Sequence, residues 1–430
     1  MIEHLHRHVV RVVDAVRRKT NMSKLLIISF DAVGDKEFNR LLQYPNFAAL
    51  AGRSAIVRKV KSVFLSNTYP VHTSVVTGVE PVMHGLINNT DRLPIHHPRW
   101  WYDAKRIQVP TLWDVATKKG LTVAAVLWPV TGKAKTIKWN VPESLADYGK
   151  SQVANNFRNG SKLLQLKLLL KYGSMIDGIN QPALDSFTTA CAKDILTEKN
   201  PDLTLVHFTA YDTLCHRHGL DSKEIDNALE TLDKNLGILR KAAGPECNVI
   251  VFSDHAQLPA DKDILPNKML AEKFGYTSET SEGYDTSKCY FECCGGSAFF
   301  RKGKLTEEDV AKVKAEIYGL KGFNRFLTNE EMRQAGRKGE SFGFCASVGY
   351  TIHNFPTDEK GDHGYPLDYD SYDVFYMGSG PDFKAGEFEE GGSLLDIAPL
   401  ACEVLGLSIR GINDPRKELL KPRALSEHKI

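Results

Sequence analysis

Seven side chains that can bind a metal ion or attack phosphorus are spread over most of the chain. Six are carboxylates or imidazoles, which suit a divalent zinc ion, and one is a threonine hydroxyl. Two clusters of such ligands beside a hydroxyl are typical of a two-metal site that attacks phosphorus. We therefore expect two Zn²⁺ ions per chain, with Mn²⁺ or another divalent metal as the alternative. The seven residues are Asp31, Thr68, Asp212, His216, Asp254, His255 and His363.

Most of these residues follow a short apolar run that is typical of a buried β-strand. LLIISFD ends on Asp31, LTLVHFTAYD ends on Asp212, and NVIVFSDH ends on Asp254 and His255. His216 lies four residues after Asp212, within reach of the same ion if the intervening turn is helical. The carboxyl ends of parallel strands meet at one edge of an open sheet, where ligands bind. A sheet of this kind would gather residues that are far apart in the sequence.

Thr68 precedes Tyr69 and Pro70 at the expected start of a helix. Proline is favoured in the first helical turn, so Thr68 would lie at or near the N-cap, where N–H groups and the helix dipole favour an anion. A threonine hydroxyl becomes a competent nucleophile when a metal lowers its pKa. Threonine is also a common helix cap, so this motif alone leaves both interpretations open.

The other motifs also have ordinary interpretations when each is taken alone. Asp31 could be a turn residue, and His255 could be a hydrogen-bonded loop histidine. His363 lies in GDHGYP, where Gly364 allows a close approach of the backbone. Their combination at the predicted strand ends favours a metal site.

The elements that must position these residues alternate along the chain, in the pattern of a parallel sheet built from βαβ units. The pattern predicts an α/β fold with three layers, in which helices cover both faces of a mostly parallel central sheet. We expect an N-terminal extension over residues 1–22 and a single catalytic domain over residues 23–430. Polar stretches at about 132–185 and 256–345 break the rhythm and are expected to be insertions near the site, where they would shape substrate choice. Strands are expected at 25–30, 54–63, 121–129, 203–208, 248–253 and 371–380, and helices at 45–52, from 71 onward and at 393–407.

Composition argues against several kinds of partner. A net charge of +2 gives no reason to expect a nucleic-acid partner. No apolar run approaches the roughly 18 residues of a membrane span, and no membrane partner is expected. The 8 cysteines are irregularly spaced, which favours reduced thiols and a cytoplasmic location. The oligomeric state stays open.

Residues 1–22 are basic and carry an apolar stripe that includes Ile2, Leu5 and Val9. We interpret them as a short helix packed on the domain, or as an extension upstream of a start at Met22. A membrane-surface or partner helix is the alternative.

The motifs, in this order, resemble those of the alkaline phosphatase superfamily and, within it, the nucleotide pyrophosphatase/phosphodiesterase family. The matching segments run from residue 25 to about residue 407 and include FDAVG, SNTYPVHTSVVTG, PVMHGLINN, YDTLCHRHG, FSDHAQ and GDHGYP. The resemblance implies an alkaline phosphatase-like fold. It also implies a zinc-dependent phosphodiesterase or nucleotide pyrophosphatase that hydrolyses a small-molecule phosphodiester or nucleotide.

The resemblance implies a role for each site residue. Thr68 would be the nucleophile and would pass through a phosphothreonine intermediate. Asn89 would donate a hydrogen bond to a phosphoryl oxygen, and Asn88 is the neighbour to test against it. Tyr69 would face the nucleobase, and Trp100 and Trp101 are further aromatic side chains that could stack on a base. One zinc ion would be held by Asp31, Asp254 and His255, with Thr68 also in contact, and the other by Asp212, His216 and His363.

The physical chemistry of the motif agrees with a diester substrate. A neutral asparagine donor suits the single charge of a phosphodiester, whereas a monoester dianion would call for arginine. No arginine flanks Thr68. The chain departs from the family pattern where Ala256 and Gln257 replace the usual glycine, and where Cys215 lies beside a ligand.

Other functions stay open at this point. A phosphonoacetate-hydrolase-like enzyme would use the same threonine and metals and would need cations for a substrate carboxylate, for which Lys133, Lys135 and Lys138 are candidates. A phosphomutase is a less favoured reading, and a sulfatase is disfavoured because position 68 is neither Cys nor Ser. The alternative outside enzymology is an inactive binding protein on the same scaffold.

Overall fold

The computed structural model describes residues 23–91 and 96–422 of the 430-residue chain. The predicted N-terminal extension over residues 1–22 lies outside the described residues. An eight-stranded sheet forms the centre of the molecule. Its strands, in spatial order, are β17 (Phe388–Glu390), β2 (Ser54–Val60), β16 (Val374–Ser379), β6 (Cys247–Phe252), β1 (Lys24–Phe30), β5 (Leu203–Phe208), β3 (Val123–Val126) and β4 (Trp139–Val141).

The strand directions confirm the predicted mostly parallel sheet. Strands β6, β1, β5, β3 and β4 form one parallel block. Strand β16 runs antiparallel to both of its neighbours, β6 and β2. The chain enters β16 from the edge where the other strands end, because His363 lies at that edge, and this return sets the opposite direction.

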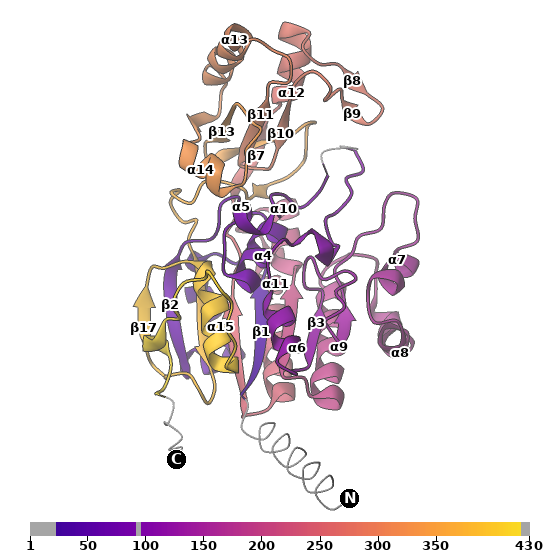
Figure 1. The fold of residues 1–430 in the computed structure, drawn as a ribbon, viewed down its shortest axis with the longest axis vertical. Helices are drawn as coiled ribbons and strands as arrows, with labels where there is room; N and C mark the ends of the chain where they lie inside the picture. The colour runs from indigo at the N-terminus through magenta and orange to yellow at the C-terminus, as the bar shows by residue number, and fades with distance from the viewer. Residues whose placement is uncertain (1–22, 92–95, 423–430) are drawn as a thin grey trace, which may run out of the picture.

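Helices cover both faces of the sheet, which gives the predicted three layers (Figure 1). Alternate residues of β1 point to opposite faces. Leu25 and Ile27 pack in the core beneath α4, α6 and α15, whereas Leu26 and Ile28 pack in the core beneath α3, α9 and α11. These helices are α3 (Pro45–Ala51), α4 (Thr68–Thr77), α6 (Leu112–Lys118), α9 (Ala183–Lys199), α11 (Lys223–Ala243) and α15 (Ile397–Leu405).

Local sequence signals account for the ends of these helices. Pro45 is the first residue of α3, and Gly406 ends α15 in the left-handed conformation. Helix α4 begins at Thr68, three residues before the expected residue 71. Pro70 is tolerated there because the first turn of a helix does not use its N–H groups. Helix α10 (Ala210–His218) follows β5, and the short helix α5 (Pro81–His84) follows α4.

A smaller unit stands above the carboxyl edge of the main sheet, at the top of Figure 1. It has its own core, in which Phe291, Phe300 and Phe344 are buried together. Its strands are β7 (Leu258–Ile264), β8 (Glu279–Thr280), β9 (Gly283–Tyr284), β10 (Tyr290–Cys293), β11 (Ser297–Arg301), β12 (Phe323–Phe326), β13 (Phe342–Ala346), β14 (Gly349–Ile352) and β15 (Gly361–Asp362). Its helices are α12 (Pro266–Met269), α13 (Glu307–Tyr318) and α14 (Asn329–Gln334).

A second excursion leaves the sheet at its β4 edge. Helices α7 (Gln152–Asn159) and α8 (Lys162–Tyr172) lie there, beside α9 (Figure 1). No helix within residues 23–91 and 96–422 is both long and apolar enough to cross a bilayer. The eight cysteines form no disulfide, in agreement with the prediction of free thiols.

Candidate active site

The carboxyl edge of the sheet gathers the six predicted Asp and His ligands into two adjacent groups. Within each group the candidate ligand atoms lie within 4.8 Å of one another. Five of these ligands lie in loops and helices that follow β1, β5 and β6, as expected for an open parallel sheet, and His363 lies in the segment after β15. The first group is Asp31, Asp254 and His255, and the second is Asp212, His216 and His363.

The first group is buried and tightly held. The Nε2 atom of His255 lies 3.3 Å from a carboxylate oxygen of Asp31 and 3.3 Å from one of Asp254. The other oxygen of Asp254 accepts hydrogen bonds from the N–H groups of Ala32 at 3.1 Å and His255 at 2.9 Å. Ala32 adopts a φ of 63°, a strained left-handed conformation for a residue with a side chain. The strained residue is therefore the one whose N–H group binds the Asp254 carboxylate.

The first group fits a bound cation. The Oδ1 atom of Asp31 and the Oδ2 atom of Asp254 are buried and accept no hydrogen bond from the described residues. Burial and the neighbouring Asp254 carboxylate raise the pKa of Asp31 well above its ordinary value. Burial also raises the pKa of Asp254 to about 6 and lowers that of His255 to about 4. A divalent cation would offset this crowding, because it favours ionised carboxylates and neutral imidazole.

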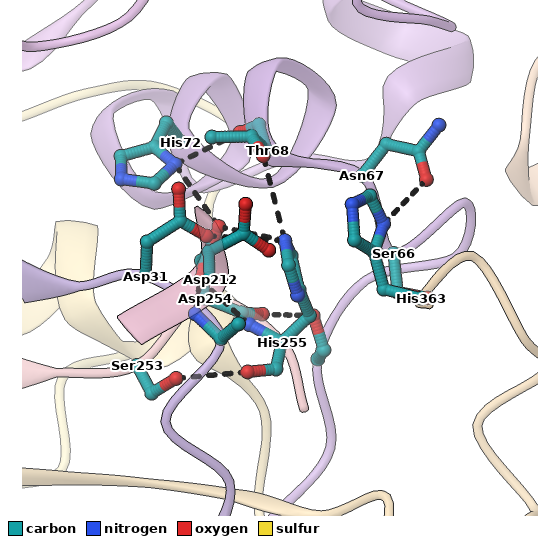
Figure 2. Close-up of polar contacts among 12 residues, drawn as sticks. Asp31, Ser66, Asn67, Thr68, His72, Asp212, Ser253, Asp254, His255 and His363 are labelled. Carbon is teal, nitrogen blue, oxygen red and sulfur yellow. Dashed lines mark hydrogen bonds and ion pairs between the residues drawn. The ribbon is translucent and has the colours of Figure 1, made fainter. Parts of the chain in front are cut away.

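Thr68 faces the first group from the start of α4. Its Oγ1 lies 3.4 Å from the Nε2 of His255, as the dashed line in Figure 2 shows. The preceding residue, Asn67, is the N-cap of α4 but makes no side-chain cap. The Thr68 hydroxyl thus lies beside the ligand atom of His255. It does so at the start of a helix, where free N–H groups favour an anion.

The second group spans α10 and the segment after β15. The Nε2 of His216 lies 3.4 Å from Oδ1 of Asp212, one helical turn earlier. His363 stacks on His255 with ring centroids 4.1 Å apart, so the two groups adjoin. Burial alone would raise the pKa of Asp212, but the imidazoles of His216 and His363 hold it below its ordinary value. A Cβ at Gly364 would lie 2.1 Å from the carbonyl oxygen of Cys294, which explains why glycine follows His363.

A hydrogen-bonded chain of asparagines connects the second group to the smaller unit. The Oδ1 atom of Asn67 lies 3.1 Å from Nδ1 of His363. The side-chain amide of Asn67 donates a long hydrogen bond of 3.4 Å to Oδ1 of Asn88. Asn88 in turn donates to Glu292 of β10 at 2.8 Å and accepts from the N–H of Asn89 at 2.8 Å. Both the amide and the carbonyl of the Asn88 side chain are therefore hydrogen-bonded to other residues of the protein.

Asn89 is placed differently from its neighbour. Its Oδ1 accepts from the backbone N–H of Tyr69 at 2.9 Å, and the residue lines a cleft of about 580 Å³ in front of the second group. The same cleft is lined by Thr68, Trp100 and Arg217. Its acidic rim comes from the 357–359 segment, which the sequence motifs did not identify.

Tyr69 and the three candidate lysines do not line this cleft. The Tyr69 ring is fully buried and contacts Trp100, with ring centroids 5.3 Å apart. Lys133 pairs with Asp103 at 3.0 Å and lines a separate cavity with Lys135. The aromatic surface that reaches the cleft belongs to Trp100.

Further buried groups support the ligands and were not identified from the sequence. The Nε2 atom of His207, in β5, lies 3.0 Å from the Asp31 carboxylate. Its Nδ1 atom lies 2.9 Å from the Glu143 carboxylate. Burial would lower the pKa of His207, but these two carboxylates raise it well above its ordinary value. A histidine inside the apolar run LTLVHF was the available signal, because a buried polar side chain requires a partner.

The outer face of His216 is supported by a third group of possible ligands, His216, Glu359 and Asp362. The Nδ1 of His216 lies 3.7 Å from Glu359, whose Oε2 also lies 3.1 Å from His353. A carboxylate behind a ligating imidazole is the usual arrangement that orients such a ligand.

Two adjoining Asp/His groups at the strand ends of an α/β sheet are candidate metal sites, in the arrangement that a two-metal phosphoryl hydrolase requires. The sequence model of the family described as type I phosphodiesterase / nucleotide pyrophosphatase matches residues 25–335, and the chain belongs to that family. It is therefore a hydrolase of the phosphodiesterase and pyrophosphatase kind, as the sequence motifs predict.

Individual relatives are distant but cover most of the chain. Bis(5'-adenosyl)-triphosphatase ENPP4 of Homo sapiens is 23% identical over 419 residues, which span 89% of this chain and 78% of that protein. Ectonucleotide pyrophosphatase/phosphodiesterase family member 7 of Homo sapiens is 23% identical over 434 residues, spanning 96% and 86%. The structure of an inactive variant of murine ectonucleotide pyrophosphatase/phosphodiesterase 5 in complex with AMP superposes with a TM-score of 0.70 at 19% identity, covering 93% of this chain and 100% of that one. This last likeness supports the fold.

Proposed function

We propose that the protein is a zinc-dependent phosphodiesterase or nucleotide pyrophosphatase in which Thr68 is the nucleophile. The observation that carries the proposal is the position of the Thr68 hydroxyl, 3.4 Å from His255 in the first ligand group and at the wall of the cleft. A nucleophile must lie both beside its activating group and beside the substrate.

The metal ions would be held by the two Asp/His groups already described. When bound, they supply positive charge that lowers the pKa of the attacking hydroxyl and stabilises charge on the leaving oxygen. The oxygen and imidazole donor set suits zinc, and Mn²⁺ is the alternative.

Thr68 would act in two steps. Its Oγ1 forms a bond to phosphorus as the bond from phosphorus to the leaving oxygen breaks, and the departing group takes up the proton lost by the hydroxyl. A water molecule then cleaves the phosphothreonine, which releases a phosphate monoester and restores the hydroxyl. Water is the only co-reactant that this hydrolysis requires.

Asn89 would bind a non-bridging phosphoryl oxygen. Its Oδ1 already accepts from the N–H of Tyr69, so the amide Nδ2 is the group left to donate into the cleft. A neutral donor suits a diester monoanion. Arg217, which also lines the cleft, offers a cation for a further phosphate of a pyrophosphate substrate.

Trp100 is the residue we propose to face a nucleobase, in place of Tyr69. The Tyr69 ring is enclosed and packs behind Trp100, so it would support the tryptophan instead of touching substrate. A flat indole that lines a cleft suits stacking on a base. The relatives named above for dinucleoside triphosphate hydrolysis and for an AMP complex support a nucleotide substrate.

A phosphonoacetate-hydrolase-like activity is less well supported. It would require cations at the substrate carboxylate, and Lys133, Lys135 and Lys138 are absent from the lining of the cleft. A cytoplasmic location, favoured by eight cysteines without a disulfide, is also part of the proposal.

Paired hydrolysis tests this function. A nitrophenyl ester of a nucleoside monophosphate and nitrophenyl phosphate would be compared with added zinc, using wild type, Thr68→Ala and Thr73→Ala. Thr73 is a matched control because it lies in the same helix and donates only to the Tyr69 carbonyl. Preferential cleavage of the diester that is lost in Thr68→Ala and kept in Thr73→Ala would support the proposal. Preference for the monoester, or full activity of Thr68→Ala, would contradict it.

A further inference from the structure

Exposed apolar side chains gather on one part of the surface. Fourteen large hydrophobic residues are exposed within residues 23–91 and 96–422, and eight of them fall between positions 148 and 179. Isolated exposed apolar residues are normal, but a concentration of this kind marks an interaction surface. The segment comprises α7, α8 and the turn that follows α8, at the β4 edge of the sheet (Figure 1).

Helix α8 carries the outermost part of this surface. Leu163 and Leu170 are 84% and 80% exposed, and Leu166 is 45% exposed. Their spacing of three and four residues places them on one face. On the opposite face, Leu164 and Leu168 pack in the core. The sequence interpretation of 132–185 as a polar stretch is wrong for this helix, which is apolar on both faces, and its outer leucines have no role in the core.

The apolar surface continues from α8 onto its neighbours. Val153 of α7, Leu169 of α8, and Ile176 and Ile179 of the following turn line one cavity of about 170 Å³. Val153 and Ile179 are themselves more than half exposed. Leu163, Leu166 and Leu170 do not line this cavity, so the leucine stripe of α8 and the apolar residues around the cavity are two neighbouring surfaces, which together we call the patch.

Basic residues surround the patch. The stretch from 148 to 179 contains five Lys or Arg residues and one acidic residue, Asp177. Lys167 and Lys171 pair with Glu198 and Asp194 of α9. The remaining basic residues, Lys150, Arg158 and Lys162, make no ion pair with any residue the structure describes. At 100° per residue, Lys162 lies on one side of the leucine stripe and Lys167 and Lys171 on the other. A leucine stripe flanked by cations is typical of a helix that lies in a lipid interface.

We propose that α7, α8 and the 175–179 turn form a docking surface for an anionic lipid bilayer. Leucine side chains would enter the acyl boundary while Lys150, Arg158 and Lys162 contact anionic headgroups. A second copy of the same patch would bring like charges together, and residues 1–22 are also basic, so charge disfavours both as the occupant. The surface revises the expectation of no membrane partner. It is independent of the proposed reaction, because none of its residues lines the active-site cleft.

Vesicle sedimentation tests the proposal with the full-length protein. The vesicles would be phosphatidylcholine alone, or phosphatidylcholine with phosphatidylserine as about one lipid in three. The test variant is Leu163→Gln with Leu170→Gln, which changes only exposed positions to a residue of similar helix propensity. The matched control is Leu42→Gln with Val348→Gln, which are exposed apolar residues outside the patch.

Wild type and control are expected to sediment with the phosphatidylserine vesicles and much less with phosphatidylcholine alone. The test variant should bind at least about tenfold more weakly, with unchanged turnover of a soluble diester. Three results would overturn the proposal: no sedimentation of wild type, equal binding of wild type to both vesicles, or undiminished binding of the test variant. A wild-type dimer that becomes a monomer in the test variant would overturn it as well, by assigning the patch to self-association.

Discussion

Asn89 and Tyr69 are joined by a hydrogen bond of 2.9 Å in which the side-chain Oδ1 of Asn89 accepts from the backbone N–H of Tyr69. Tyr69 directly follows Thr68, so this bond between residues twenty positions apart also fixes the asparagine relative to the threonine. The amide end of Asn89 is thereby oriented by the backbone of α4, and does not depend on substrate for its position.

Asn89→Ala is expected to lower kcat for the diester by about 10²-fold, because a preorganised donor to the developing charge is lost. Its melting temperature should change little, since the site is partly exposed. Asn88→Ala should show the reverse, a loss of stability with a smaller effect on kcat, because Asn88 donates to the buried Glu292. Steady-state kinetics and thermal denaturation of both variants check this contrast. Equal loss of kcat in the two variants would contradict the assignment of Asn89.

Each ligand group is expected to hold one metal ion. Asp254→Asn and Asp212→Asn replace a carboxylate with an amide of the same shape, and each should lower the bound zinc from about two ions per chain toward about one. Elemental analysis of dialysed protein measures the content. Asp202→Asn is the control, because Asp202 is a buried aspartate that accepts from Thr122 away from the site. Unchanged zinc in either ligand variant would remove that residue from the metal site.

A buried ion pair within the smaller unit, between Arg337 and Glu292, also contacts the loop that carries Asn88 and Asn89. Arg337 is buried and forms an ion pair with Glu292 at 2.7 Å through Nη1, and its Nη2 donates to the carbonyl of Ile87 at 2.9 Å. Arg337→Met is expected to reduce the free energy of unfolding by about 3–5 kcal/mol, because it removes the cation that offsets the Glu292 charge.

The double variant Arg337→Met with Glu292→Gln separates charge from packing. It should recover part of the lost stability, since no uncompensated charge remains. Urea denaturation of the single and double variants supplies the comparison. A double variant no more stable than Arg337→Met alone would show that the charge of Glu292 is not the source of the loss.

His84 is expected to make the protein sensitive to mild acid. Burial lowers the pKa of His84 to about 3, and the neutral ring accepts from the N–H of Leu86 at 3.1 Å and lies 2.9 Å from Ser74. The unfolded chain binds a proton on this residue below about pH 6.5, whereas the folded chain does not until about pH 3. The free energy of unfolding therefore falls as the pH drops through this window.

The contribution of His84 is expected to be a loss of about 2 kcal/mol between pH 7 and pH 5. His84→Gln should remove that part of the pH dependence, although it is less stable than wild type at pH 7. Denaturant unfolding at several pH values measures the slope, with the exposed His97→Gln as control. Parallel slopes for wild type and His84→Gln would contradict a buried neutral histidine.

The sequence permitted more of the metal site to be predicted than of the cleft. The ligands Asp31, Asp212 and Asp254 follow apolar runs, and the hydrophobic period of a buried strand is a local property that a single sequence displays. Since parallel strands share one carboxyl edge, placing these runs in one sheet was enough to bring the ligands together. The start of α4 was expected three residues late, because the helix was expected to begin after Pro70, which occupies the third helical position.

The supporting groups could not be predicted in this way. The contacts of His207 with Asp31 and of Asn88 with Glu292 join residues separated by 176 and 204 positions. Nothing in the neighbourhood of either residue indicates its partner. The burial of Tyr69 behind Trp100 likewise depends on how the loop around residue 100 folds back on α4.

The sequence by itself determined the family, the α/β class and the ligand types, since these depend on residue identity, order and local periodicity. Only the tertiary structure decided that Asn88 binds Glu292, which aromatic residue lines the cleft, and that α8 turns a leucine face to solvent. These properties depend on which surfaces are left over after the core has packed. A leucine repeat has the same pattern in a sequence whether it lies in the core or on the surface, and only the packing of the neighbouring elements distinguishes the two.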